Sequence, residues 1–553
     1  MRWGTPVRMS EVQAGGAEGS AAAAHTVVSP IANPGEGARL WRGALIVAVL
    51  AVVALWLVAG YFDPGRLHIR GMSSRLNDQA GYITTARILA DTGELRSGLV
   101  MPAFADNPAS RVYMPGHYAL LALSYKLFGY SVWTSLLPNL LAFVVAAVAV
   151  FLIGARRYGP LAGGAASIFM ILFPPNLLFA FTAMAEGTFL AVGILGFGVF
   201  TCLGERGRLL AAPFLVGSSF LFRETGALWV VPLGLMMLFE ARSWGRRRAI
   251  LLVVATVGVV FALNRWQLAS GKEAPPLTWL MGSRFNYGDA QAVATAQNAL
   301  APDQLPGLVL TNVARNFENL IDKVLAAPGQ FEGSSVLVML TVLVATVLVG
   351  LVRIRRDSLP LGAAGMALAT WALAFGLYDV VGLKLLRSSM FFMPICAVAL
   401  AGTACRAFGA PQRAGRAAFS VLAVIVLTAW LGWTVPICRQ AGIEVTAGDA
   451  EADRTLETVE QIGHDETKLL VAPWLLGLEY SVAHYPVRYS FPIENLAGLS
   501  LLDQQIPIGT LILPRGKLAD FPPADLRRVG LVRSGRIDGG GGAASYLVFQ
   551  VAR

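Results

Sequence analysis

Asp78 is the first side chain along this sequence whose type and position suggest chemistry. It precedes a segment, residues 79–91, in which apolar side chains recur at helical spacing, and Gly93 supplies a stop. The pattern predicts a short amphipathic helix of the kind that lies at a membrane surface. Asp78 then either caps this helix, as aspartate does well, or is a carboxylate held in place as a general base. The two interpretations are compatible, because a capping position fixes a side chain.

Residues 113–118 (YMPGHY) form a second polar group. They lead into an apolar run that ends at Gly129 and is too short to span a bilayer. We expect this run to lie in the interface or to enter a helical bundle from the side. His117 is either a surface or hydrogen-bonded polar residue or a catalytic one. Three tyrosines here are typical of the aromatic belt at a membrane interface: Tyr113, Tyr118 and Tyr125.

Isolated charges interrupt the apolar sequence further along. Arg223 and Glu224 separate two unusually short apolar runs, and Glu186 lies near the outward end of another. Helices that short leave their junction below the bilayer surface, so these charges must face a polar cavity or each other. Lys384 and Arg387 open a later run, where they either snorkel to the interface or bind a lipid phosphate. Each charge is therefore either part of a structural ion pair or part of an anion site.

The elements that must position these side chains are membrane-spanning helices. Of the 553 residues, 55% are apolar and only 14% are charged, a composition that excludes soluble enzymes and DNA-binding proteins. A crossing needs roughly 20 apolar residues. Eleven segments are candidates: 44–61, 132–154, 161–180, 184–203, 209–222, 226–240, 249–266, 334–352, 361–381, 388–405 and 417–436. The sequence therefore predicts a polytopic α-helical membrane protein.

The arginines predict the orientation of these crossings. The net charge is +10. If the chain changes side at each crossing, most arginines near the crossings fall in loops on the same side of the membrane. The short loops on the other side hold Arg223, Lys384 and Arg387. By the positive-inside rule the N-terminus is cytoplasmic, and an odd number of crossings leaves the C-terminus outside. We therefore predict a multi-pass protein of the plasma (inner) membrane that contacts membrane lipids and no nucleic acid.

Three regions are predicted along the chain. Residues 1–42 are poor in large apolar side chains and are expected to form a disordered cytoplasmic tail. Residues 43–436 form the membrane domain, with long outward loops at 62–116 and 267–333. Residues 437–553 form a small extracytoplasmic α/β domain, because short apolar runs alternate there with Pro and Gly. This domain is expected to contain a polar helix ending at 455–462 and strands at 468–471, 509–513 and 546–551.

Five sequence stretches, taken in order over residues 44–436, resemble a known family. One is Asp78 followed by Tyr82, Ala86 and Gly93. The others are MPGHYALLALSYKLFG (114–129), AMAEGTFLAVGIL (183–195), FLFRETGALWVVPLGL (220–235) and RSSMFFMPICAVALAG (387–402). Together they resemble the GT-C superfamily of membrane glycosyltransferases, in particular the branch that contains protein O-mannosyltransferases and bacterial aminoarabinose transferase.

The resemblance implies a glycosyltransferase that moves a sugar from a polyprenyl-phosphate donor to an acceptor hydroxyl of a lipid, glycan or protein. Transfer is expected on the extracytoplasmic side with Asp78 as the base. Such a donor already carries a good leaving group, so one base and one or two cations suffice, and in-line attack inverts the anomeric carbon. Arg223, Lys384 and Arg387 are the candidate cations. The predicted donor-binding set is completed by Glu186, Tyr82 and His117.

Two features depart from the family pattern. The family often has Glu after the Asp, whereas Gln79 follows here, so the sequence predicts no second carboxylate and no metal site. The Arg often found after the LFG stretch is absent from residues 135–139. The four cysteines show neither disulfide nor metal-ligand spacing. No cofactor is therefore predicted, and a divalent metal is left open.

Two other functions also need outward cations and intramembrane charges. A transporter or flippase of a lipid-linked sugar is one, but the internal repeat typical of transporters is not found, and a surface helix within 62–116 favours an active site. A polysaccharide polymerase or ligase is the other. It would bind its glycan through aromatic residues of the loop 267–333, which an ordinary amphipathic loop explains equally well.

Overall fold

The computed structural model describes most of the helical core and part of the C-terminal region. The described segments are 34–62, 78–95, 99–100, 114–203, 205–240, 253–259, 313–318, 331–353, 357–377, 383–409, 413–462, 468–471, 488–490, 507–537 and 546–551, with a few isolated positions between them. Most of the two loops predicted at 62–116 and 267–333 therefore lies outside the described residues. The tail predicted at 1–42 is described only from Pro34, where the first helix already begins.

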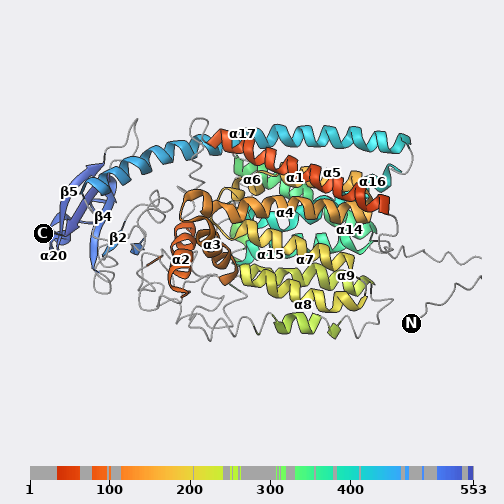
Figure 1. Ribbon diagram of the computed structural model, residues 1–553, viewed down its shortest axis with the longest axis horizontal. Coiled ribbons are helices and arrows are strands. Elements are labelled where there is room, and N and C mark those ends of the chain that lie inside the picture. Colours follow the sequence, from red (N-terminus) through yellow and green to blue (C-terminus); the bar gives the residue numbers. More distant parts are fainter. Residues whose placement is uncertain are drawn as a thin grey trace, which may run out of the picture.

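A bundle of helices forms the centre of the molecule (Figure 1). Its members are α1 (Pro34–Phe62), α4 (Val132–Tyr158), α5 (Pro160–Ile171), α6 (Pro174–Ala180), α7 (Glu186–Cys202), α8 (Glu205–Phe222), α9 (Val230–Glu240), α14 (Phe331–Arg353), α15 (Ser358–Leu377), α16 (Leu383–Ala407) and the first part of α17 (Arg413–Ile462). Two shorter helices, α2 (Asp78–Thr92) and α3 (Pro115–Phe128), lie together at one end of the bundle. One continuous hydrophobic core joins these helices.

The helices confirm a multi-pass membrane protein. Among the described residues, four helices are long and apolar enough to cross a membrane, and a bent pair supplies a fifth. Five shorter apolar helices coincide with other predicted crossings, such as Glu186–Cys202 with 184–203. The crossing predicted at 249–266 lies largely outside the described residues. The number eleven therefore stays a prediction.

The crossing predicted at 161–180 is not one straight helix. It consists of α5 and α6, which are bent by 62° at their break. Pro174 and Pro175 begin α6, and proline cannot donate the backbone hydrogen bond that would continue α5. Thr434 of α17 donates a hydrogen bond from its hydroxyl to the carbonyl of Leu172 at this break. A neighbouring helix thus compensates for the interruption.

Pro138 lies inside α4 without ending it. Proline lacks an N–H, so the carbonyl four residues earlier, that of Thr134, loses its helical partner. The Ser124 hydroxyl of α3 donates to this carbonyl over 2.7 Å. The interruption therefore ties α3 to the start of α4, next to the predicted site residues of α3.

The chain between α8 and α9 is a 3₁₀ helix, η4 (Glu224–Trp229). A close backbone approach makes this junction compact: a Cβ atom on Gly226 would lie 2.4 Å from the backbone of Ser219 and Phe220. Only glycine has room there. The junction holds Arg223 between α8 and η4 in an extended conformation, with φ −153° and ψ 144°.

The C-terminal region contains a six-stranded sheet in the order β1-β3-β2-β4-β6-β5. Its strands are β1 (Leu99–Val100), β2 (Leu469–Val471), β3 (Arg488–Ser490), β4 (Ile508–Pro514), β5 (Leu531–Ile537) and β6 (Tyr546–Val551), with α20 (Pro523–Arg528) between β4 and β5. Three of them coincide with the predicted strands at 468–471, 509–513 and 546–551. The domain boundary predicted at 437 falls inside α17, which runs unbroken from the bundle to the sheet (Figure 1).

The edge strand β1 was not predicted. It comes from the segment after α2, and it pairs in parallel with β3 through Leu99 with Tyr489 and Val100 with Ser490. The first outward loop and the C-terminal sheet are therefore joined by backbone pairing, although almost 400 residues separate them in the sequence.

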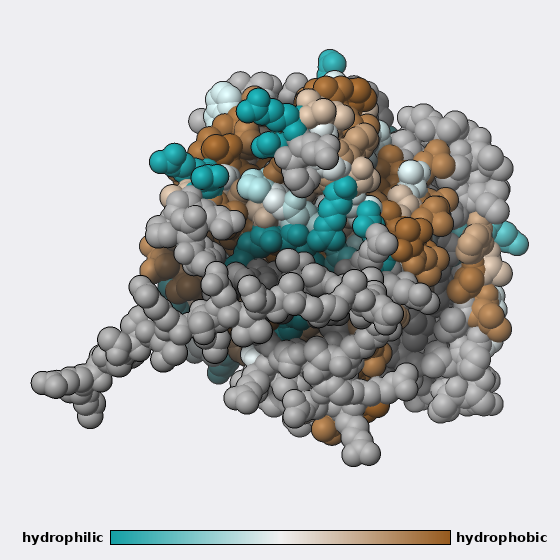
Figure 2. Space-filling model, turned by 90° about the vertical axis from the view of Figure 1, so that its right-hand side faces the viewer, coloured by the Kyte–Doolittle hydropathy of each residue, from teal (hydrophilic) through white to brown (hydrophobic). Residues whose placement is uncertain are grey.

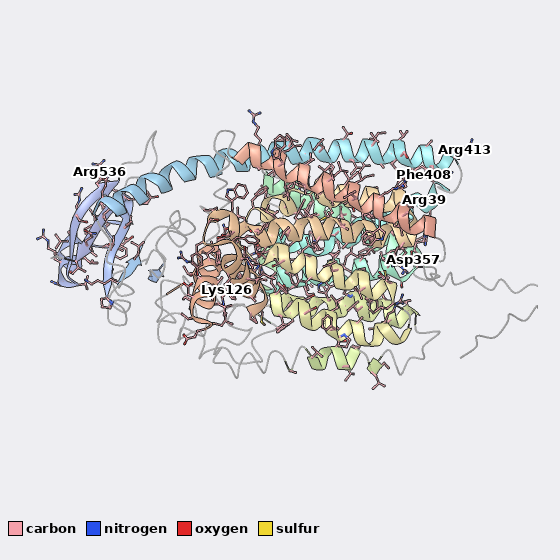
Figure 3. The ribbon with its side chains drawn as sticks, viewed as in Figure 1. Arg39, Lys126, Asp357, Phe408, Arg413 and Arg536 are labelled. Carbon is pink, nitrogen blue, oxygen red and sulfur yellow. The ribbon has the colours of Figure 1, made fainter. Side chains whose placement is uncertain are left out.

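Charged side chains lie at both ends of the bundle. Figure 3 shows Arg39, Asp357 and Arg413 at one end, whereas Lys126 lies towards the other end and Arg536 beyond it in the sheet. Figure 2 views the first end, where hydrophilic residues gather near the centre among apolar ones. Arginines close helices α4, α14 and α16 at this end. The positive-inside rule counts such arginines when it assigns the cytoplasmic face.

Candidate active site

Helix α2 carries Asp78 as its first residue, and it ends at Thr92 before Gly93, which has a φ of 76°. The helix predicted at 79–91 is confirmed. The side chain of Asp78 lies outside the described part of the chain. Tyr82, one turn later and therefore on the same helical face as Asp78, is buried. Its ring contacts those of His117 at 5.1 Å and Tyr118 at 5.2 Å between centroids. Asp78 therefore starts the face of α2 that packs on α3.

His117 is completely buried, so it is not a surface residue. Its Nε2 lies 2.9 Å from the carbonyl of Ala183, and its Nδ1 lies 2.9 Å from the hydroxyl of Thr188. Burial lowers the pKa of His117 to about 4, so the ring is neutral at pH 7. The neutral ring then donates from Nε2 to the carbonyl and accepts at Nδ1 from Thr188. Both ring nitrogens are used to connect α3 with the start of α7.

The turn between α6 and α7, residues 181–185, is held by three side chains from three other helices, which we call the clamp: Gln79, His117 and Asn139. Gln79 of α2 accepts the backbone N–H of Ala183 at 2.9 Å. Asn139 of α4 donates to the carbonyls of Thr182 and Met184 at 2.7 and 2.6 Å, and its Oδ1 accepts the N–H of Thr188 at 3.0 Å. The clamp supplies partners for a buried, non-helical turn that would otherwise be costly in a membrane.

Glu186, the first residue of α7, directly follows the clamped turn and is completely buried. Its Oε1 accepts from two guanidinium groups, those of Arg223 and Arg387. Its Oε2 is buried and has no hydrogen-bond partner among the described residues. The structure thus brings together three of the predicted donor-binding residues, which lie up to 201 positions apart in the sequence.

The position of Arg387 differs from the prediction that it lies in an outward loop where water satisfies it. Helix α16 begins at Leu383, so Arg387 and Lys384 are both helical. The side chain of Arg387 is 19% exposed and that of Arg223 is 18% exposed. The apolar run after Arg387 begins within the helix, and an early start of α16 moves the charge into the bundle. The side chain of Lys384 lies outside the described residues.

Two arginines from different helices meet on a single carboxylate in this cluster. Ionisable residues within a membrane domain generally pair with one another or bind a ligand. Arginine presents a planar fork of donors that suits a phosphate or carboxylate group. The cluster is therefore a candidate anion site.

Two glycines let the site assemble closely. A Cβ atom on Gly187 would lie 2.7 Å from Oδ1 of Asn139, so the clamp needs glycine directly after Glu186. A Cβ atom on Gly116 would lie 2.8 Å from the carbonyl of Leu221, two residues before Arg223. The backbone of α3 thus packs directly on the end of α8.

Sequence reasoning missed Gln79 and Asn139 as parts of the site. Gln79 attracted notice only as a departure from the family pattern. Asn139 was visible as a lone amide in the apolar run 132–154, which is the usual signal of a buried hydrogen-bonded group in a membrane helix. No group of three or more His, Cys, Asp or Glu side chains with the geometry of a metal site lies among the residues that the structure describes.

One known family matches part of this chain. Residues 106–266 match the sequence profile of the family described as dolichyl-phosphate-mannose-protein mannosyltransferase. This segment includes His117, Glu186 and Arg223. A comparison with curated proteins gives no match.

Two solved structures illustrate the similarity. ArnT from Cupriavidus metallidurans bound to undecaprenyl phosphate is 13% identical, over 92% of this chain and 98% of that chain, with a TM-score of 0.43. The oligosaccharyltransferase of Archaeoglobus fulgidus in complex with zinc and sulfate is also 13% identical, over 90% of this chain and 72% of that chain, with a TM-score of 0.49. The family match confirms the resemblance to the protein mannosyltransferase branch of the GT-C superfamily and supports a membrane glycosyltransferase as the class of this protein.

Proposed function

We propose that this protein transfers a sugar from a polyprenyl-phosphate donor to an acceptor hydroxyl at the extracytoplasmic face of the membrane. The observation that carries the proposal is the buried Glu186 carboxylate that holds both Arg223 and Arg387. The matching family is described as dolichyl-phosphate-mannose-protein mannosyltransferase, and this description supports a lipid-phosphate donor. The acceptor is a hydroxyl of a lipid, glycan or protein.

The donor phosphate binds the two arginines in this proposal. Glu186 holds both guanidinium groups on one oxygen, and the planar fork of donors on a guanidinium group suits the oxygens of a phosphate. The same positive charge stabilises the phosphate as it leaves the sugar, where negative charge increases. Lys384, one turn before Arg387 in α16, is a third candidate cation.

Asp78 is the proposed general base. It begins the face of α2 that packs on α3. Its neighbour Gln79 accepts a hydrogen bond from the turn that directly precedes Glu186. A base at this place would remove the proton of the acceptor hydroxyl as it attacks the anomeric carbon opposite the phosphate, with inversion. No acid is needed, because the lipid phosphate is a good leaving group.

The arginines at one end of the bundle support the proposed sidedness. They close α4, α14 and α16 at the end that holds Arg39, whereas α2, α3 and the sheet lie at or beyond the other end. We therefore place the N-terminus in the cytoplasm and the C-terminus outside, in the plasma (inner) membrane. Reporter fusions at Met1 and Arg553 should be active on opposite sides, and activity on one side would contradict this topology.

The substitution Asp78→Asn tests the chemistry. Asparagine keeps the shape of the side chain and suits a helix N-terminus as well as aspartate does, but it is not a base. Transfer from undecaprenyl-phosphate sugars by the reconstituted protein should fall at least about a hundredfold. The yield of folded protein and the binding of undecaprenyl phosphate should stay the same. Turnover close to that of the wild type would remove Asp78 from the mechanism.

A further inference from the structure

We infer that Gln79 and Glu186 form a recognition site for hydroxyl groups of the transferred sugar, beside the phosphate site. This inference rests on the proposed function and extends it from the phosphate to the sugar. It starts from two buried polar atoms that have no hydrogen-bond partner among the described residues: Nε2 of Gln79 and Oε2 of Glu186. Buried groups of this kind are rare in folded proteins, because leaving them unpaired is energetically costly.

Each of the two side chains is already fixed by its other atom. Oε1 of Gln79 accepts the N–H of Ala183, so the amide group cannot turn freely to find another partner for its N–H groups. Oε1 of Glu186 holds both arginines, which fixes the carboxylate and its second oxygen. Both side chains are at most 1% exposed, so bulk water does not replace the missing partner.

The two atoms belong to one small unit. Gln79 is anchored at Ala183, and Glu186 follows Ala183 by three residues in the same clamped turn. Three residues of chain extend over at most ~10 Å. The amide and the carboxylate are therefore anchored on the same short turn of the chain. Asp78, the proposed base, is the residue adjacent to Gln79.

The two atoms have opposite hydrogen-bonding roles. The Gln79 amide nitrogen can only donate, and the ionised Glu186 oxygen can only accept. A phosphate oxygen satisfies the first but not the second. A hydroxyl group both accepts and donates, so a sugar with several hydroxyls can satisfy both atoms at once. A site built to pair polar groups of its substrate strongly rejects analogues that lack them.

Binding measurements on the full-length protein in nanodiscs test this inference. The probes are undecaprenyl phosphate and its mannosyl, glucosyl, galactosyl and arabinosyl forms. The wild type should bind at least one sugar form about tenfold or more tightly than bare undecaprenyl phosphate. Equal affinity for the bare form and all four sugar forms would overturn the inference while leaving the phosphate site intact. Failure to bind any of the five probes would instead reject the proposed function.

Two variants of Gln79 identify the atom responsible. Gln79→Glu keeps an oxygen for the Ala183 N–H but removes the amide donor, and Gln79→Met removes both without adding a charge. Both should lose most of the preference for the sugar form, measured within each variant as the ratio of its affinity for that form to its affinity for bare undecaprenyl phosphate. Unchanged preference in both variants would overturn the inference.

Asn176→Asp is the matched control. Asn176 of α6 is also a buried amide with an unpartnered atom, its Oδ1, but its nitrogen donates to Met170 and not to the clamped turn. The control should keep the sugar preference of the wild type. If it loses that preference as the Gln79 variants do, the effect comes from general damage to the bundle, and the sugar site is rejected.

Discussion

Glu186 and Asp357 are both buried carboxylates that hold two arginines, yet they lie at opposite ends of the bundle. Helix α16 contributes to both clusters, with Arg387 to the first and Arg406 to the second. Nineteen residues of helix separate these arginines, about 28 Å along the axis. The same residue types therefore occur twice, and the way their atoms are paired distinguishes the two clusters.

Asp357 has partners on both oxygens. Its Oδ1 accepts from Arg157 at 2.8 and 3.2 Å and from the N–H of Leu359, and its Oδ2 accepts from Tyr158 at 2.7 Å and Arg406 at 3.0 Å. Burial alone would raise the pKa of Asp357, but Arg157 and Tyr158 outweigh it and hold that pKa below its ordinary value. Every acceptor is used, and Asp357 fastens α4 and α16 to the start of α15.

Glu186 has both arginines on one oxygen and no partner for the other among the described residues. Arg406 is 42% exposed and can complete its hydration, whereas both arginines of Glu186 are less than 20% exposed. A saturated cluster stabilises the fold, while an unsaturated one leaves atoms for a ligand. The comparison teaches that charge alone does not mark a site; unused hydrogen-bonding capacity does.

The largest expected effect concerns the saturated cluster. Asp357→Asn should lower the free energy of unfolding by about 2–4 kcal/mol, because it removes the buried carboxylate charge that Arg157 and Arg406 share. Transfer per folded molecule should not change. Thermal unfolding in detergent and a reconstituted transfer assay measure the two effects. Lost transfer at wild-type stability would place Asp357 in the chemistry and break the comparison.

A substitution in the clamp should lower the stability of the fold nearly as much. Gly187→Ala places a methyl group 2.7 Å from Oδ1 of Asn139, and such overpacking costs about 1–3 kcal/mol. It should also weaken binding of undecaprenyl phosphate, since the turn before Glu186 moves. Gly164→Ala in α5 is the control, because nothing lies within 4 Å of its Cβ position. Equal effects of the two substitutions on thermal stability would show that the clamp is not tightly packed.

Binding of undecaprenyl phosphate should depend on the arginines that Glu186 holds and not on those that Asp357 holds. Arg223→Lys replaces a fork of donors by a point charge, and it should weaken binding of undecaprenyl phosphate about tenfold, or about 1.4 kcal/mol. Arg406→Lys, at the other cluster, should leave that affinity unchanged. Titrations with the two purified variants, and with Lys384 and Arg387 replaced in turn, measure the difference. If only Lys384 or Arg387 matters, the phosphate binds at α16 and Arg223 has a structural role.

The smallest expected effect concerns the hydrogen bond between α3 and α4, two of the helices that carry the site. Ser124→Ala removes the donor to the Thr134 carbonyl that Pro138 leaves free, which should cost about 1 kcal/mol of stability. Ser218→Ala is the matched control. Its hydroxyl donates to the carbonyl of Leu215 within α8. Pro213 lies inside this helix, but it removes the partner of the carbonyl four residues before it and not that of Leu215. The midpoints of thermal unfolding should fall for the first variant only. A similar fall in both variants would mean that the Thr134 carbonyl finds another hydrogen-bond donor.

The sequence predicted the classes of element well because these depend on local pattern. The apolar runs indicated the helices of the bundle, the period of 79–91 indicated α2, and alternating short runs indicated three strands of the sheet. It did not predict the break between α5 and α6, the early start of α16, or the pairing of β1 with β3. Each of these depends on a partner that is distant in the sequence.

For the site, the sequence by itself determined the candidate residues, since an isolated charge in an apolar run is costly and therefore conspicuous. Arg223, Arg387 and Glu186 were found in this way, and Asp78 was found from its place at the start of a predicted surface helix. Only the tertiary structure decided that Glu186 receives both arginines, that Gln79 and Asn139 hold the turn before it, and that one of its oxygens stays unused. Hydrogen-bond saturation is a property of atoms brought together by packing, so it cannot be read from residue types alone.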